Sequence, residues 1–294
     1  MSTVQDLKNL QPQKEFFIGI DSDGCVFDSM EPKHKECFCP AFINNFNLQS
    51  VSKYARETWD FVNLYSQSRG CNRFHAVIKA LDLLRERPEV KKRGAIIMET
   101  PVLKSWTERE SKLGNPALKA ELEKTNDPEL RLVYQWSLDV NDAVKKIIRG
   151  VPPFMLFRES LGMMRQKADI IVVSQTPTDT LVREWAELGL DKQVRYIAGQ
   201  ELGTKSEHLS WAAKDKYPVN KILMIGDAPG DLNAAKSIGA LFYPINPGHE
   251  DESWKRFHDE ALERFFCMNY EGAYQEALLD EFSTYLPEKA PWQK

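Results

Sequence analysis

The sequence lacks several features that mark large classes of proteins. It has no strong excess of either charge, because 39 Lys and Arg residues face 43 Asp and Glu residues, a formal net charge of −4. A nucleic-acid or anionic-membrane partner is therefore not expected. The longest aliphatic runs, such as IIVV and ILMI, are far shorter than the roughly 18 residues of a membrane-spanning helix.

Cysteine and histidine are also sparse and unpatterned. The five cysteines do not form a disulfide framework, and the closest pair, Cys37 and Cys39, has CxC spacing. The five histidines show no HExxH or other metal-ligand spacing. The first residues, MSTVQDLKNLQPQKEFF, lack a basic start followed by an apolar run. We therefore expect a cytoplasmic protein with reduced thiols.

Short apolar runs that end in polar residues predict buried parallel strands. The strongest are FFIGID (16–21), DIIVVS (169–174) and KILMIGD (221–227), and weaker candidates lie at 196–199 and 240–245. Helical periodicity follows these runs, at 177–188, 205–216 and 232–238. Strands and helices that alternate in this way predict an α/β fold with a Rossmann-like parallel sheet.

Residues 30–150 have a different pattern, with long helical periodicity and few strand signals. One amphipathic helix is expected to begin at Asp127 and Pro128, and the polar break 66–73 is expected to separate two others. The VPPF segment after Gly150 interrupts helix formation. We expect an α/β core made of residues 1–29 and 151–294, and an all-helical insertion, 30–150, after the first strand.

Polar side chains follow the predicted strands at the points where each strand ends. Asp21 and Asp23 follow the first strand, and Ser174 the second. Asp227 follows a later strand, with Asp231 four residues further on. Because functional groups collect at the carboxyl ends of parallel strands, these side chains are expected to converge.

The four motifs, taken in order, resemble those of the haloacid dehalogenase superfamily of phosphohydrolases. They are DSDG at 21–24, Ser174 after IIVV, Lys205 in GTKSEHL, and GDAPGD at 226–231. The resemblance covers about residues 14–30 and 150–247. It implies a Rossmann-like core, and the insertion resembles the type 1 cap of this superfamily by its position and its helicity alone.

The resemblance also implies a role for each motif residue. Asp21 would attack phosphorus and form an aspartyl phosphate, and Asp23 would act as general acid and then as general base. Ser174 would donate a hydrogen bond to a phosphoryl oxygen, and Lys205 would neutralise charge on the nucleophile and the phosphoryl group. Asp23 argues for phosphoryl chemistry, because haloacid dehalogenases lack this second acid.

A divalent cation would offset the repulsion between a carboxylate and a phosphate dianion, and Mg²⁺ is the expected cofactor. By resemblance its ligands would be the carboxylates of Asp21 and Asp227 and the main-chain carbonyl of Asp23. Asp231 would contribute through water or by orienting the other ligands.

Further substrate-binding candidates depend on weaker signals. Gly24 and Gln175 lie beside the motif residues, where the absence of a Cβ at Gly24 lets the backbone approach a phosphate. Arg69 and Arg73 lie in the polar break of the helical insertion, where they would grip a second anionic group of the substrate, unless this segment is only an exposed turn.

The expected function is Mg²⁺-dependent hydrolysis of a small phosphorylated metabolite. One alternative is a phosphomutase with the same paired aspartates, and another is a phosphate-binding protein without turnover. The aromatic-rich stretch from Trp254 to Phe282 is expected either to pack on the sheet or to form a dimer face, so a monomer and a homodimer both remain open.

Overall fold

The computed structural model describes residues 3–293, which form two compact units. The sheet unit consists of the chain through Met30 together with Gly150–Leu286. The helical unit consists of Glu31–Arg149 together with the segment that starts at Pro287. The expected assignment of all of 151–294 to the α/β core therefore differs from the structure, because the last residues pack with the helical unit.

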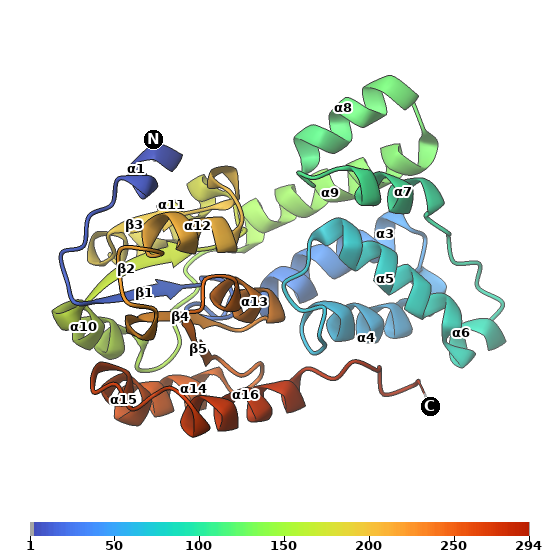
Figure 1. The fold of residues 1–294 in the computed structure, drawn as a ribbon. Helices are drawn as coiled ribbons and strands as arrows, with labels where there is room; N and C mark the ends of the chain where they lie inside the picture. Colours follow the sequence, from blue (N-terminus) through green and yellow to red (C-terminus); the bar gives the residue numbers. More distant parts are fainter. Residues whose placement is uncertain (1–2, 294) are drawn as a thin grey trace. The chain divides into compact units, whose positions relative to one another are not determined.

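A five-stranded parallel sheet lies at the centre of the sheet unit, as the strand pattern predicts (Figure 1). The strand order is β3-β2-β1-β4-β5, and every neighbouring pair is parallel. The strands are β1 (Phe16–Ile20), β2 (Ala168–Val173), β3 (Tyr196–Ala198), β4 (Ile222–Gly226) and β5 (Leu241–Pro244). The α/β fold with a Rossmann-like sheet is thus confirmed.

Helices cover both faces of this sheet, because alternate residues of each strand point to opposite sides. In β1, Ile18 belongs to one buried cluster and Phe17 to the other. Residues of α10, α11, α14 and α15 join the cluster of Ile18, and residues of α1, α12 and α13 join that of Phe17. Both faces are therefore buried, which explains the nearly unbroken apolar character of the strands.

The helices of the sheet unit lie close to the predicted ranges. They are α1 (Val4–Lys8), α10 (Phe157–Lys167), α11 (Thr178–Glu187), α12 (Lys205–Ala212), α13 (Pro229–Ser237), α14 (Glu250–Arg256), α15 (Leu262–Phe266) and α16 (Ala273–Tyr285). Helix α12 ends earlier than predicted, because the chain then turns through Asp215, whose φ of 62° is left-handed.

The aromatic side chains after β5 pack inside the sheet unit. Trp254, Phe257 and Phe265 are fully buried in the cluster that contains Ile18. Helix α16 covers the β5 edge, where the Gln275 side chain accepts a hydrogen bond from the Phe242 N–H at 2.9 Å. Of the two roles expected for the aromatic stretch, packing on the sheet is therefore the one observed.

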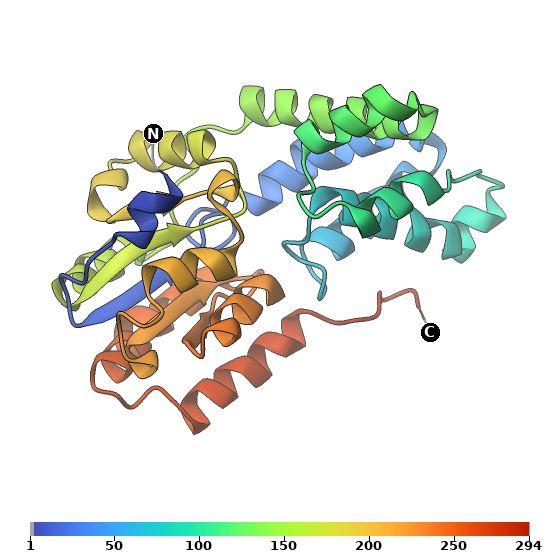
Figure 2. The same ribbon diagram turned by 45° about the horizontal axis from the view of Figure 1, so that its top comes forward.

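The helical unit is built from helices, as Figure 2 shows. They surround a buried core that is rich in aromatic side chains. Its α-helices are α2 (Met30–Pro32, which begins in the sheet unit), α3 (Cys39–Asn45), α4 (Ser52–Asn63), α5 (Arg73–Glu86), α6 (Pro88–Lys92), α7 (Pro101–Arg109), α8 (Asn115–Thr125) and α9 (Pro128–Ile147), with a π-helical segment at Lys33–Phe38. The Asp127 side chain caps α9 by accepting from the N–H groups of Glu129 and Leu130 at 2.8 and 3.1 Å. Trp59 and Trp136 are fully buried between these helices.

Within residues 3–293, no helix combines the length and apolar content that a membrane span requires.

The start of β2 carries a buried carboxylate, Asp169, that ties the N-terminal segment to the sheet. It accepts hydrogen bonds from the N–H groups of Gln13 and Lys14 at 2.7 and 2.9 Å. The Tyr217 hydroxyl and the Arg195 guanidinium donate to it at 2.6 and 2.8 Å. Although burial by itself would raise the pKa of Asp169, these hydrogen bonds lower it.

Replacement of this carboxylate should destabilise the protein. We expect Asp169→Asn to lower the free energy of unfolding in urea by about 2–3 kcal/mol. The reason is that the buried donors around residue 169 lose a charged acceptor and face a neutral amide instead. The exposed pair of Glu15 and Lys221 is the control, and Glu15→Gln should cost less than about 1 kcal/mol. A lowered pKa stabilises the fold above about pH 4, so the Asp169→Asn deficit should shrink below that pH. Equal losses in the two variants would contradict this role.

Candidate active site

The carboxyl ends of β1, β2 and β4 bring the predicted motif residues together at one edge of the sheet. The Asp21 N–H donates to the Ile225 carbonyl at 3.0 Å, which aligns Asp21 with the end of β4. The Ser174 N–H donates to the Ala198 carbonyl at 3.0 Å, which extends the pairing of β2 with β3. The register of the strands thus fixes the backbone positions of Asp21 and Ser174, and the parallel pairing of the strands makes these residues neighbours.

Lys205 connects two of the acids. It is the first residue of α12, where Thr204 and Glu207 form a reciprocal cap. Its Nζ lies 2.7 Å from Asp21 Oδ2 and 2.6 Å from Asp231 Oδ1. The helix start therefore fixes an ammonium between two carboxylates that come from opposite ends of the sequence.

Asp231 is oriented by the turn that opens α13. Its Oδ2 accepts hydrogen bonds from the N–H groups of Asp227 and Ala228, at 3.2 and 3.1 Å. Gly226 permits this turn, because a Cβ at that position would lie 2.4 Å from Asp231 Cβ. The glycine of GDAPGD is thus required by close approach of a side chain.

Three carboxylates gather around this lysine and fit a divalent cation. One oxygen each of Asp21, Asp227 and Asp231 lies within 4.8 Å of the others, and all three residues are buried. Oxygen donors of this kind match the preference of Mg²⁺. Burial of three acids beside one ammonium leaves an excess of negative charge, which a divalent cation would balance.

This crowding shifts the acid–base behaviour of the cluster. Burial, together with the charge of Asp231, raises the pKa of Asp21 to about 6, although Lys205 pulls it down. Burial also raises the pKa of Asp231. For Lys205, burial alone would lower the pKa, but the two carboxylates outweigh it and keep the ammonium protonated.

The side chain of Asp23 is not part of the three-carboxylate cluster. Its Oδ2 accepts a hydrogen bond from the Thr176 hydroxyl at 2.8 Å, and its Oδ1 accepts one from Ser29. Two hydroxyl groups therefore hold this carboxylate in a fixed orientation beside the nucleophile candidate. The metal ligand expected from Asp23 is its main-chain carbonyl, and this contact stays a prediction.

Thr176 and Ser29 were not identified from the sequence. Thr176 had a usable signal, because it follows Ser174 by two residues in a loop at a strand end. Ser29 had none, since its proximity to Asp23 comes from a tight turn in which the Gly24 N–H donates to the Phe27 carbonyl. The φ of Gly24 is 74°, so a glycine is favoured at this turn.

The remaining predicted residues near the strand ends have structural partners. Ser174 is buried, and its hydroxyl accepts a hydrogen bond from the Thr176 N–H at 3.2 Å. The Gln175 amide donates to the Gly203 carbonyl at 3.0 Å and so fixes the loop before Lys205. The Gly24 N–H donates to the Phe27 carbonyl within its own turn, and its contact with a phosphate stays a prediction.

Arg69 and Arg73 lie in the helical unit, at the predicted polar break. Arg69 is buried, and its guanidinium donates to the Leu64 carbonyl at 2.9 Å. Arg73 Nη1 donates to Ser137 Oγ at 3.0 Å and to Asn141 Oδ1 at 2.8 Å. The Arg73 guanidinium carbon also lies 5.1 Å from the centroid of the Phe38 ring.

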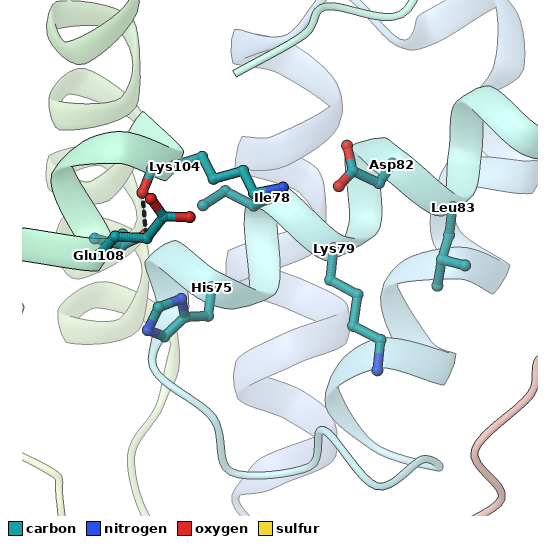
Figure 3. A pocket seen from close by; sticks show the side chains of 8 residues that line it. His75, Ile78, Lys79, Asp82, Leu83, Lys104 and Glu108 are labelled. Carbon is teal, nitrogen blue, oxygen red and sulfur yellow. Dashed lines mark hydrogen bonds between the residues drawn. The ribbon is translucent and has the colours of Figure 1, made fainter. Parts of the chain in front are cut away.

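A shallow pocket of about 350 Å³ lies on the helical unit between α5 and α7 (Figure 3). Its lining mixes bases such as Lys79 and Lys104 with the acids Asp82 and Glu108. Asp82 pairs with Arg85, and the Thr107 hydroxyl donates to the Lys104 carbonyl. A lining that mixes charges of both signs does not favour a particular ligand.

Comparisons with known proteins give matches among solved structures alone. No protein-family model matches the chain, and no curated protein matches it. The chain is similar to a structure described as a predicted phosphoglycolate phosphatase from Haemophilus somnus 129PT, with 15% identity, coverage of 79% of this chain and 86% of that one, and a TM-score of 0.49. It is also similar to a β-phosphoglucomutase from Clostridium difficile, with 10% identity, coverage of 85% and 96%, and a TM-score of 0.49. A hydrolase from Pseudomonas syringae shows 14% identity, coverage of 82% and 90%, and a TM-score of 0.47.

Proposed function

We propose that this protein is a Mg²⁺-dependent phosphatase that hydrolyses a small phosphorylated metabolite through an aspartyl phosphate. The observation that carries the proposal is the position of Lys205, whose Nζ lies within 2.7 Å of both Asp21 and Asp231 in a buried carboxylate cluster. A fixed ammonium beside a carboxylate and a cation site is an arrangement that stabilises a transferring phosphoryl group.

Asp21 is the nucleophile in this proposal. Its carboxylate attacks phosphorus in line, the ester P–O bond breaks, and Asp23 gives a proton to the leaving oxygen. Water then attacks the phosphorus, Asp23 takes its proton, and the bond from phosphorus to Asp21 breaks to release phosphate. Thr176 and Ser29 support this assignment, because they orient the Asp23 carboxylate for both transfers.

The remaining site residues bind the cation and the phosphoryl group. The carboxylates of Asp21 and Asp227, the Asp23 carbonyl, and Asp231 directly or through water would hold Mg²⁺, which supplies positive charge against the carboxylate–phosphate repulsion. Ser174 donates to a phosphoryl oxygen.

We further propose that residues 30–150 act as a cap that selects the substrate. Arg73 is proposed as a contact to an anionic group of the substrate, because its guanidinium donates to the neutral acceptors Ser137 and Asn141 and lies over the ring of Phe38. Arg69 is proposed with it as a substrate contact.

Replacement of the two aspartates should separate their roles. With Mg²⁺ and a panel of phosphomonoesters, we expect Asp21→Asn to abolish phosphate release and labelling by beryllofluoride. Asp23→Asn should lower kcat by about 10²–10⁴-fold, the usual loss for a general acid–base, while beryllofluoride still binds. Turnover that survives Asp21→Asn would overturn the proposal. An isomerised sugar phosphate in place of inorganic phosphate would identify a phosphomutase.

Thr176 should act as a positioning residue. Thr176→Ala removes one hydrogen bond to Asp23, and we expect kcat to fall about tenfold, corresponding to about 1.4 kcal/mol, with KM little changed. Thr178→Ala is the matched control, since that hydroxyl donates to Glu201. Thr176→Ser should restore activity, and equal effects of both alanine variants would argue against positioning.

Mg²⁺ binding should depend on pH through Asp21. Calorimetry on chelator-treated protein should show affinity that is flat above about pH 7 and falls about tenfold per pH unit below the Asp21 pKa of about 6, because protons compete with the cation. Asp227→Asn should weaken binding at every pH. Asp23→Asn should leave it nearly unchanged, since that side chain lies outside the cluster. Affinity independent of pH from 5 to 7 would refute Asp21 as a ligand.

A further inference from the structure

A short loop, residues 22–27, follows β1 in the sheet unit and carries Asp23. Within this loop, the Ser22 carbonyl accepts hydrogen bonds from the N–H groups of Val26 and Phe27, at 2.9 and 3.1 Å. These bonds fold the loop into a compact turn, but they connect its residues only to one another. The place of the loop relative to the nucleophile candidate therefore depends on contacts that other elements make with it.

Two buried tryptophans supply such contacts through their indole N–H groups. Trp185 of α11 donates from Nε1 to Ser22 Oγ at 3.0 Å. Trp254 of α14 donates from Nε1 to the Cys25 carbonyl at 2.7 Å. All four residues are fully buried, so water does not readily replace either donor, and loss of an indole N–H costs the loop a buried hydrogen bond.

The two acceptors lie on either side of Asp23 in the chain. Ser22 is the residue between the two aspartates of the DSDG motif, and Cys25 directly follows that motif. The Asp23 carboxylate itself is held by the hydroxyl groups of Thr176 and Ser29. The indoles thus restrain the loop, whereas the hydroxyl groups restrain the carboxylate that the loop carries.

The core of the sheet unit holds both indoles in place. The Phe157 ring lies edge-on to Trp185 and to Trp254, at 6.0 and 5.0 Å between centroids. The Phe27 ring lies edge-on to Trp185 at 5.5 Å. All four rings belong to the buried cluster of Ile18. Because a tryptophan joins a large apolar body to one N–H donor, this packing also fixes the direction in which the donor points.

We propose that Trp185 and Trp254 are positioning residues that hold the loop 22–27 and thereby keep Asp23 beside Asp21. Neither indole contacts the reacting atoms, and each acts through the loop residue to which it donates. The effect on catalysis rests on the proposed phosphatase function. The hold on the loop does not, so the two are tested separately.

Hydrogen exchange of the loop amides tests the hold without any assay of activity. In Trp185→Phe and in Trp254→Phe, which keep an aromatic ring and remove the donor, we expect the amides of Val26 and Phe27 to exchange about tenfold faster, as measured by NMR. Ser22→Ala should have the same effect as Trp185→Phe, since it removes the acceptor of that bond and leaves both indoles in place.

Tyr270→Phe is the matched control. Its buried hydroxyl donates to the Phe242 carbonyl at 2.7 Å in the same apolar cluster, so this variant also loses a buried hydrogen bond, but away from the loop. We expect it to leave the exchange of the loop amides unchanged. The amide of Ile18, in the central strand β1, reports opening of the whole sheet. Loop amides that accelerate no more than Ile18 in the tryptophan variants would overturn the proposal, because the indoles would then only stabilise the fold.

Kinetics test the consequence for the proposed reaction. With Mg²⁺ and a phosphomonoester that the unaltered protein hydrolyses, Trp185→Phe and Ser22→Ala should each lower kcat about tenfold with KM little changed. The double variant should also lose about tenfold rather than a hundredfold, because both changes remove the same hydrogen bond. Tyr270→Phe should retain kcat.

The two measurements separate the possible failures. If the unaltered protein hydrolyses no phosphomonoester, the proposed function fails, and the exchange experiment still decides whether the indoles hold the loop. If it is active and the loop amides accelerate, but kcat is unchanged in both tryptophan variants, the role of the indoles in positioning Asp23 is refuted. A hundredfold loss in the double variant would show that Trp185 does not act through Ser22.

Discussion

The site depends on the electrostatic cost of burying carboxylates side by side. Asp21, Asp227 and Asp231 come from the ends of two strands and the first turn of a helix, and each would lose hydration without compensation. Lys205 compensates Asp21 and Asp231, and backbone N–H groups hold Asp231. The negative charge that remains makes the cluster suited to a divalent cation, because carboxylates whose charge was fully neutralised would bind a metal ion weakly.

The parallel sheet makes this arrangement possible. Both faces of the sheet are covered by helices, so the ends of its strands are where polar groups reach solvent and ligands. Hydrogen-bonded register fixes the starting points of Asp21 and Ser174, and helix caps fix those of Lys205 and Asp231. Rigid elements thus supply most of the geometry, and the hydroxyl groups of Thr176 and Ser29 supply the orientation of Asp23.

The helical unit contributes a separate core. Its aromatic cluster around Trp59 and Trp136 requires no contact with the sheet to be buried. The chain enters and leaves this unit through paired segments and returns to it after α16. The residues after α16 thus add to the core of the helical unit.

The sequence by itself determined the strands, the parallel order implied by alternating helices, and the acids and lysine that we propose for the site. Apolar runs and strand-end polar residues are local patterns, so the sequence reveals them directly. Only the tertiary structure decided that Thr176 and Ser29 orient Asp23, that the Gly24 N–H is used in a turn, and that the last residues join the helical unit. These facts depend on which segments far apart in the chain become neighbours, and packing free energy summed over the whole core decides this. No local sequence pattern predicts that Trp292 contacts Arg87, because Arg87 lies about two hundred residues earlier in the chain. The helices that bring Arg87 to Trp292 lie outside the segment that contains Trp292.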